Sequence, residues 1–298
     1  MFRKFFSNLF LPDQSYLLML LALGVFTGGV LSCSNPSDTF GQADYGQNFK
    51  SAWAQDKFWD DGLAEVAIYE AQRVVYNKSR QFEYTLITVK EDFNKAFNVK
   101  TDDYQRKDLF PVMKVNEFAR IPTDNYPYHY LTSLFFKREN PLILYKLTSS
   151  SQEWCGTTFK AINQIGNFFN YQFNSYWDNQ GTGELKLKKL ALFEDQLPYT
   201  LRSLKFAENL KFSAPVYELQ QTSKATPPQL YQAQFKVSRS SDSKFASGAW
   251  LVTVQLNPDK QSQYWFDTQY PHALLRQKSY DGRTLELKSI RRYAYWQH

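Results

Sequence analysis

The sequence has few of the residues that build reactive or cross-linked centres. It contains two cysteines and three histidines in 298 residues. With Cys33 expected to be acylated, Cys155 has no intramolecular partner, and the fold must be held by burial instead of disulfides. The histidines are dispersed and lack the ligand spacing of zinc sites. We therefore expect no metal and no cofactor.

Motifs for phosphate, dinucleotide and acyl transfer are also missing. The sequence has no GxxxxGK[ST], GxGxxG or GxSxG pattern. Its paired acids are adjacent in sequence, whereas a glycosidase needs two carboxylates facing each other across a cleft. The net charge is +6, in short, interrupted basic clusters. Without a basic stripe, nucleic acid is not an expected partner. We expect no enzymatic activity.

The first 32 residues have the layout of a lipoprotein signal peptide. Arg3 and Lys4 precede an apolar run over residues 17–30, which is shorter than the roughly 20 residues of a comfortable membrane span. The run ends in Val30-Leu31-Ser32-Cys33, which resembles a lipobox. We expect cleavage before Cys33, acylation of its thiol and therefore a membrane partner through the lipid.

The residues after this signal predict the domain layout and the location. Residues 33–50 comprise the lipidated cysteine and a polar, weakly periodic stretch, and we interpret them as a flexible tether. Residues 51–298 are expected to form a single β-rich domain. Ser34 favours the outer membrane by its resemblance to lipoprotein sorting rules, so we expect an outer-membrane lipoprotein, on either its periplasmic or its surface side.

Aromatic residues are abundant, with 20 Tyr, 25 Phe and 7 Trp, and such residues are enriched in strands. Alternation over 169–177 and 231–237 predicts strands with one wet face. Hairpins are expected at Asn77-Lys78-Ser79 and Asp281-Gly282. A further strand is expected at 216–220. Leucines at helical spacing predict a helix near 195–206 and a short helix is possible at 51–61. The fold class is mostly β: an antiparallel meander forming a curved sheet, half-barrel or sandwich, with one or two short helices.

The stretch from Ser149 to Gly156 gathers serine, glutamate, tryptophan and the one cysteine of the domain. Cys155 could be a nucleophile with His129 as its base, but the nearby Glu153 would raise the pKa of a thiol. We interpret Cys155 as a small apolar residue packed in the sheet. Ser149–Gln152 is expected to be a turn that leads Trp154 and Cys155 into a central strand.

From Trp53 onward the chain resembles a family of bacterial, Bacteroidota-type lipoproteins. Members often carry the label "septum formation inhibitor Maf", which describes nucleotide pyrophosphatases with a Ser-x-Ser-Pro-Arg-Arg loop and an α/β fold. This sequence has neither feature, so that activity is not carried over. The resemblance implies an envelope lipoprotein without assigned catalytic residues. Its marks are Trp59-Asp60-Asp61-Gly62, Glu91-Asp92-Phe93, Tyr270-Pro271 and, most specific, the family motif Ser151, Gln152, Glu153, Trp154, Cys155 and Gly156.

Three functions are compatible with these features. The first is a non-catalytic lipoprotein that binds a lipid, another amphiphile or an envelope component, and it requires an apolar cavity of about 300 Å³ or more if it encloses acyl chains. The second is a structural or interaction module in envelope or surface-complex assembly. The third is an envelope hydrolase with polar groups converging near Cys155 or Glu153.

Overall fold

The computed structural model describes residues 45–245 and 248–297. The expected signal peptide, Cys33 and most of the tether lie outside the described residues. Among the residues that are described, no helix has both the length and the apolar character needed to cross a membrane.

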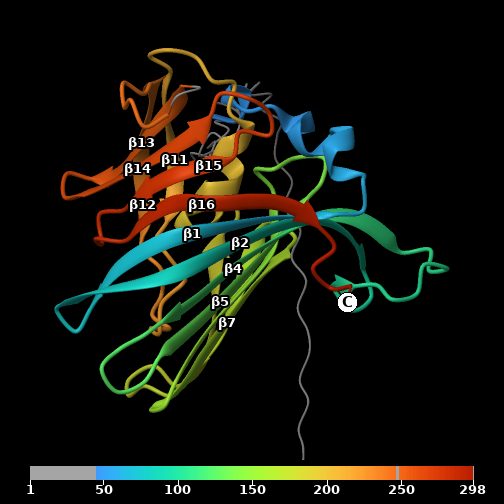
Figure 1. Cartoon of the computed structure of the whole chain (residues 1–298). Coiled ribbons are helices and arrows are strands. Elements are labelled where there is room, and N and C mark those ends of the chain that lie inside the picture. The colour runs from blue at the N-terminus through green and yellow to red at the C-terminus, as the bar shows by residue number, and fades with distance from the viewer. Residues whose placement is uncertain (1–44, 246–247, 298) are drawn as a thin grey trace, which may run out of the picture. The chain divides into compact units, whose positions relative to one another are not determined.

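The described chain forms one large sheet, which is largely antiparallel and is not closed into a barrel (Figure 1). The strand order is β10-β11-β12-β13-β14-β15-β16-β1-β2-β4-β5-β6-β7-β8-β9, with β3 paired to β2. The expectation of a mostly β meander is confirmed. The strands are β1 (Ala64–Val75), β2 (Lys78–Asn94), β3 (Val99–Lys100), β4 (Leu109–Ile121), β5 (Tyr128–Lys137), β6 (Leu144–Glu153), β7 (Gly156–Ile165), β8 (Phe168–Ser175), β9 (Thr182–Lys188), β10 (Leu192–Phe193), β11 (Lys211–Tyr217), β12 (Leu230–Arg239), β13 (Ala249–Asn257), β14 (Lys260–Asp267), β15 (Leu274–Lys278) and β16 (Thr284–Tyr293).

Period-two alternation explains why these segments are strands. In β12 every second residue is buried, beginning with Tyr231, while Gln232, Gln234 and Lys236 are exposed. The inward residues of both halves of the sheet belong to a single hydrophobic core. The sheet therefore bends around one core and presents its other face to solvent.

The centre of that core is the chain segment that joins β9 to β11. Residues 191–204, which we call the inner segment, are all buried. They contain β10 and three short helical turns: η4 (Glu194–Gln196), α2 (Leu197–Thr200) and η5 (Leu201–Ser203). The Tyr199 ring stacks on Phe136 of β5 at 4.4 Å between centroids. The inner segment thus fills the concave side of the sheet.

Antiparallel pairing gathers the strand connections at two opposite ends of the sheet. One end holds the turns after β1, β4, β6, β8, β11, β13 and β15; we call it the hairpin end. The other end holds the turns after β2, β5, β7, β12 and β14 (Figure 1). Phe49 bridges Leu204 there, so the first described residues pack at the end remote from the hairpin end.

Several local predictions differ from the structure in their limits. The first hairpin turns at Tyr76-Asn77, one residue before the expected position, and the Asp281-Gly282 hairpin is present. The expected strand at 216–220 is β11, which ends at Tyr217. The expected helix near 195–206 is the helical part of the inner segment. Tyr45 and Phe49 are buried, so the folded part begins before the expected boundary at 51. Residues 51–61 contain two 3₁₀ helices, η2 (Ser51–Gln55) and η3 (Lys57–Trp59).

A buried ion pair fixes the inner segment to the sheet. The Arg202 guanidinium donates to both carboxylate oxygens of Glu65 on β1, at 2.7 and 3.0 Å, and both side chains are 3% exposed. The same guanidinium lies over the rings of Trp53 and Trp59. Removing one partner would strand a charge in the core, which is far more costly than removing both.

We therefore expect Arg202→Met to lower the free energy of unfolding by about 3–5 kcal/mol, because Glu65 loses its counter-charge. The double variant Glu65→Leu with Arg202→Met should be more stable than the single variant. Urea unfolding at pH 7, followed by tryptophan fluorescence, measures both. A single variant within about 1 kcal/mol of the unmodified protein would contradict this role for the pair.

Candidate functional site

The stretch Ser151–Gly156 lies at a hairpin tip, not in the middle of a strand. Ser151, Gln152 and Glu153 end β6, Trp154 and Cys155 form the turn, and Gly156 begins β7. The expected turn at Ser149–Gln152 is therefore wrong. Those polar residues continue β6, because they pair with β5 on one side and β7 on the other.

Cys155 is exposed, so the expectation of a thiol packed in the sheet is also wrong. Its sulfur lies 3.4 Å from the Tyr126 hydroxyl, in the loop between β4 and β5. His129 sits on the opposite face of β5 from Tyr128 and Tyr130, as the alternation predicts. The cysteine and histidine are thus not brought together as a nucleophile and base.

The serines of this stretch have a packing role on the concave face. Ser149 and Ser151 point inward and are buried, while Gln152 is exposed. The Ser149 hydroxyl donates to the Gln220 carbonyl oxygen at 3.1 Å. Gln220 belongs to residues 218–225 between β11 and β12, which we call the inner loop. Small side chains on β6 leave the space that this loop occupies.

Aromatic side chains from four strand connections and from the start of β5 gather at the hairpin end. We call Tyr76, Tyr126, Tyr128, Trp154 and Tyr176 the aromatic rim. Trp154 stacks on Tyr126 at 5.6 Å, and Tyr126 lies 5.8 Å from Tyr128. The Tyr76 and Tyr128 hydroxyls are hydrogen-bonded to each other. Trp154 is 78% exposed. Linked rings of this kind form a surface that is both apolar and able to hydrogen-bond.

Gly156 allows one member of the aromatic rim to lie close to the backbone. A Cβ atom at this position would be 2.3 Å from Cγ of Tyr176, which is closer than real Cβ contacts. The glycine of the motif is therefore explained by the approach of the Tyr176 ring from the loop after β8. Any larger residue would move that ring.

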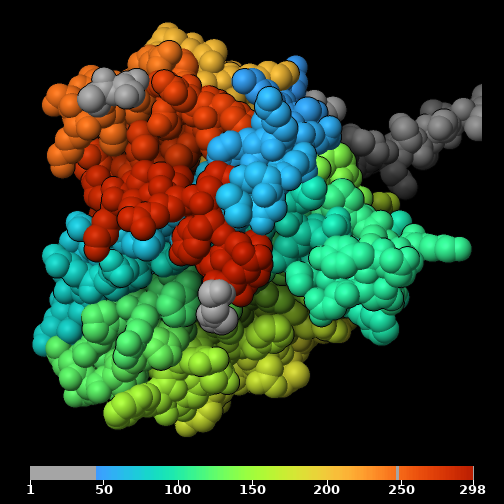
Figure 2. Space-filling model, turned by 45° about the vertical axis from the view of Figure 1, so that its right-hand side comes forward, coloured from blue at the N-terminus to red at the C-terminus, as the bar shows by residue number. Residues whose placement is uncertain are grey.

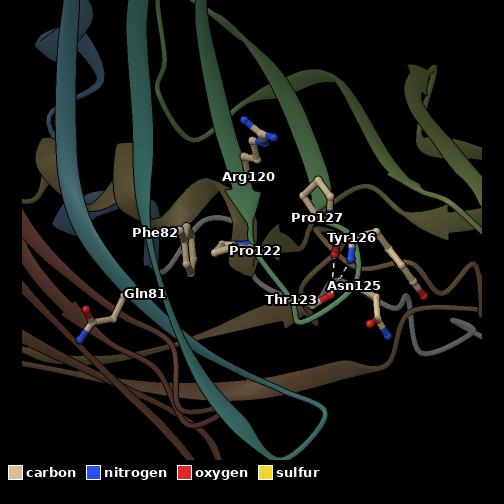
Figure 3. A pocket seen from close by; sticks show the side chains of 8 residues that line it. All are labelled: Gln81, Phe82, Arg120, Pro122, Thr123, Asn125, Tyr126 and Pro127. Atoms are coloured by element: carbon tan, nitrogen blue, oxygen red, sulfur yellow. Dashed lines mark hydrogen bonds between the residues drawn. The ribbon is translucent and has the colours of Figure 1, made fainter.

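A hollow of about 380 Å³ adjoins the aromatic rim. Figure 3 shows Phe82 of β2 beside Pro122 at the start of the β4–β5 loop, with Arg120 further along β4. Tyr126 and Pro127 complete the lining from the other end of the loop. Thr123 holds this loop in shape, since its hydroxyl donates to the Tyr126 carbonyl oxygen at 2.5 Å.

Charged groups beside the rim are paired. Both terminal nitrogens of Arg80 donate to the Asp124 carboxylate, at 2.7 and 3.0 Å, and Lys78 adds a third bond at 2.8 Å. These bonds, led by the one from Arg80, hold the pKa of Asp124 below its usual range. Partial burial raises the pKa of Glu153, while hydrogen bonding to Tyr128 opposes that shift. Beside the rim, the positions of the Arg80, Asp124 and Lys78 charges are thus fixed by their mutual hydrogen bonds.

A second polar group lies inside the sheet, beneath the inner loop. The Lys160 ammonium donates to the carbonyl oxygens of Gln220 at 2.5 Å and Lys224 at 2.8 Å. The Asp195 carboxylate accepts from the backbone N–H groups of Gln220 and Gln221, at 2.8 and 2.9 Å. A base on β7 and an acid on the inner segment therefore clamp the inner loop on the concave face.

This buried cluster holds more acids than bases. Glu117 of β4, Glu194 and Asp195 face Lys160 and Arg283, and all are buried. Burial raises the pKa of Glu117 to about 8, and the nearby Asp195 charge adds to the shift, while Arg283 opposes it. Burial likewise raises the pKa of Glu194 to about 7 and lowers that of Lys160 to about 8. If Glu117 keeps its proton at neutral pH, the two remaining carboxylates balance the two bases and the cluster carries no net charge.

The sequence reasoning missed both the aromatic rim and the buried cluster. A signal for Lys160 existed, since period-two alternation puts it on the same inward face of β7 as Thr158 and Ile162. The remaining members come from distant strands and loops. Among the described residues, no group of three or more His, Cys, Asp or Glu could hold a metal ion. No protein-family model, curated protein or solved structure matches the chain.

Glu117 makes stability depend on pH. Its carboxyl titrates near 4.3 when unfolded and near 8 when folded, so the folded state binds the extra proton between these values. Stability should therefore fall as pH rises through this window. Glu117→Gln should remove on the order of 4 kcal/mol of the decline between pH 5 and 8.

Urea midpoints at the two pH values measure this effect, with Glu139→Gln, an exposed carboxylate, as the control. The control should decline in parallel with the unmodified protein. If Glu117→Gln declines just as steeply, the carboxyl of Glu117 is not the group that titrates.

Proposed function

We propose that the protein is a non-catalytic lipoprotein of the outer membrane, anchored through Cys33, that binds an envelope protein through its aromatic rim. The observation that carries this proposal is the chain of contacts from Trp154 through Tyr126 and Tyr128 to Tyr76 at the hairpin end, whose two outer rings are open to solvent: Trp154 is 78% exposed and Tyr76 is 64% exposed. Tyrosine and tryptophan dominate the binding energy of protein interfaces. Rings already stacked on each other lose little conformational entropy when a partner covers them.

The hollow beside the aromatic rim strengthens the case for a protein partner. Its lining by Phe82, Pro122 and Pro127 offers an apolar pocket for one side chain, next to the fixed charges of Arg80 and Asp124. Interfaces typically combine such a pocket with a polar surround.

An enclosed acyl chain is less well supported by the geometry. The inner segment and the inner loop fill the concave side of the sheet. A small apolar hollow between Ala191, Pro215 and Leu230 has a volume of about 190 Å³, below the roughly 300 Å³ of ordinary ligand pockets. Catalysis is not part of the proposal, since the thiol of Cys155 contacts a tyrosine hydroxyl and His129 faces the other side of β5.

A photo-crosslinking residue in place of Trp154 should trap one defined envelope protein in living cells. The control position is Ile165, which is also exposed but lies at the opposite end of the sheet. With the purified pair, Trp154→Ala combined with Tyr176→Ala should weaken binding at least about tenfold, or about 1.4 kcal/mol.

Two results would overturn the assignment of a protein partner. A lipid adduct at position 154 would show that the rim binds an amphiphile instead. The same products at positions 154 and 165 would show that the crosslinks report chance encounters.

A further inference from the structure

A second hollow lies at the end of the sheet remote from the aromatic rim. Its volume is about 450 Å³, within the range of ordinary ligand pockets. It forms where the last residues of β2, the connection between β3 and β4, and the C-terminal residues 294–297 come together. In Figure 2 the red C-terminal tail lies against the blue-green residues that follow β2.

Three aromatic rings line this hollow and remain open to solvent. Tyr104, from the β3–β4 connection, is 65% exposed, and Trp296, from the tail, is 47% exposed. Tyr295 meets Trp296 edge to face at 5.0 Å, which fixes the orientation of the pair. The rings come from two segments that are far apart in sequence. The fold brings them together, so neither segment would form this polar, aromatic-lined hollow alone.

Four of the five charged side chains that line the hollow are in ion pairs, so it offers donors and acceptors with little net field. Lys114 of β4 contacts Glu91 of β2 at 2.7 Å, and both side chains are mostly buried. Lys90 contacts Asp60 at 2.6 Å, in the turn before β1. Lys100 contacts Asp102 at 3.1 Å. Lysines already neutralised by carboxylates are poor ligands for phosphate, but their remaining N–H groups and the carboxylate oxygens can bond hydroxyls.

We propose that this hollow binds a neutral saccharide of two or three pyranose units. One face of a pyranose ring carries C–H bonds that pack on an aromatic ring, which Tyr104 and Trp296 supply. The hydroxyls around the edge of the sugar both donate and accept hydrogen bonds, which matches the mixed Lys and Glu lining of the hollow. The inference is independent of the aromatic rim, because the two surfaces share no residue and lie at opposite ends of the strands.

The test titrates the full-length protein, in a detergent without sugar, with maltotriose, cellotriose, the β-1,4-linked trimer of N-acetylglucosamine and inorganic phosphate. Isothermal titration calorimetry should detect binding of at least one trisaccharide and no binding of phosphate. Trp296→Ala and Tyr104→Ala should each weaken that binding about tenfold or more, since a stacking face is lost. Trp296→Phe and Tyr104→Phe keep a ring and should retain most of it.

Removing residues 294–298 provides a second route to the same answer, and Ile165→Ala is the matched surface control. Both variants should keep the urea midpoint of the unmodified protein, and only the truncation should lose saccharide binding. The proposal is overturned if none of the three trisaccharides binds, if phosphate binds more tightly than they do, or if the truncation binds as well as Ile165→Ala. Crosslinking at position 154 should be unchanged by the truncation, so the two proposals succeed or fail separately.

Discussion

The fold depends on the burial of the inner segment against the concave side of the sheet. An open sheet of this size leaves an apolar face that must be covered, and residues 191–204 cover it from within the same chain. Tyr199 and the leucines around it supply apolar contact, and the Arg202–Glu65 pair fixes the register of the segment against β1. Both halves of the sheet pack on this one element, so neither half has a complete core without it.

The buried charges follow from the same constraint. The inner loop and the inner segment bring backbone polar groups into the core, and each such group needs a partner there. Asp195 accepts two N–H groups and Lys160 donates to two carbonyl oxygens, so the charges serve as hydrogen-bonding groups for the backbone. Holding these groups costs desolvation, which appears as the raised pKa of Glu117 and the lowered pKa of Lys160. Perturbed pKa values often mark catalytic sites, but here the burial of these side chains in the core accounts for them.

Local patterns predicted the strands, and they failed where contacts are long-range. Alternation identified β12, and turn residues identified the hairpin at Asp281-Gly282, because both depend on neighbours in sequence. The prediction of a turn at Ser149–Gln152 is wrong, because these residues continue β6. The small Ser149 leaves room for the inner loop, some 70 residues later, and donates a hydrogen bond to it. A free cysteine predicts a buried side chain, whereas the pairing of β6 with β7 leaves Cys155 at an exposed tip. The aromatic rim joins four separate connections, a proximity that only the strand order creates.

Strand order also decides how the two proposed binding surfaces relate. The aromatic rim and the hollow at Tyr104 and Trp296 are both carried by β2 and β4 or their adjoining loops, but at opposite ends of those strands. A long, continuously paired strand is stiff, so a ligand at one end changes little at the other unless the pairing slips. Slippage of β2 or β4 by one residue would turn the buried Glu117 and Tyr84 toward solvent, and the core forbids that. Such a sheet therefore favours simultaneous and independent binding: a protein partner at the end remote from Phe49, and a saccharide at the end where the described chain begins.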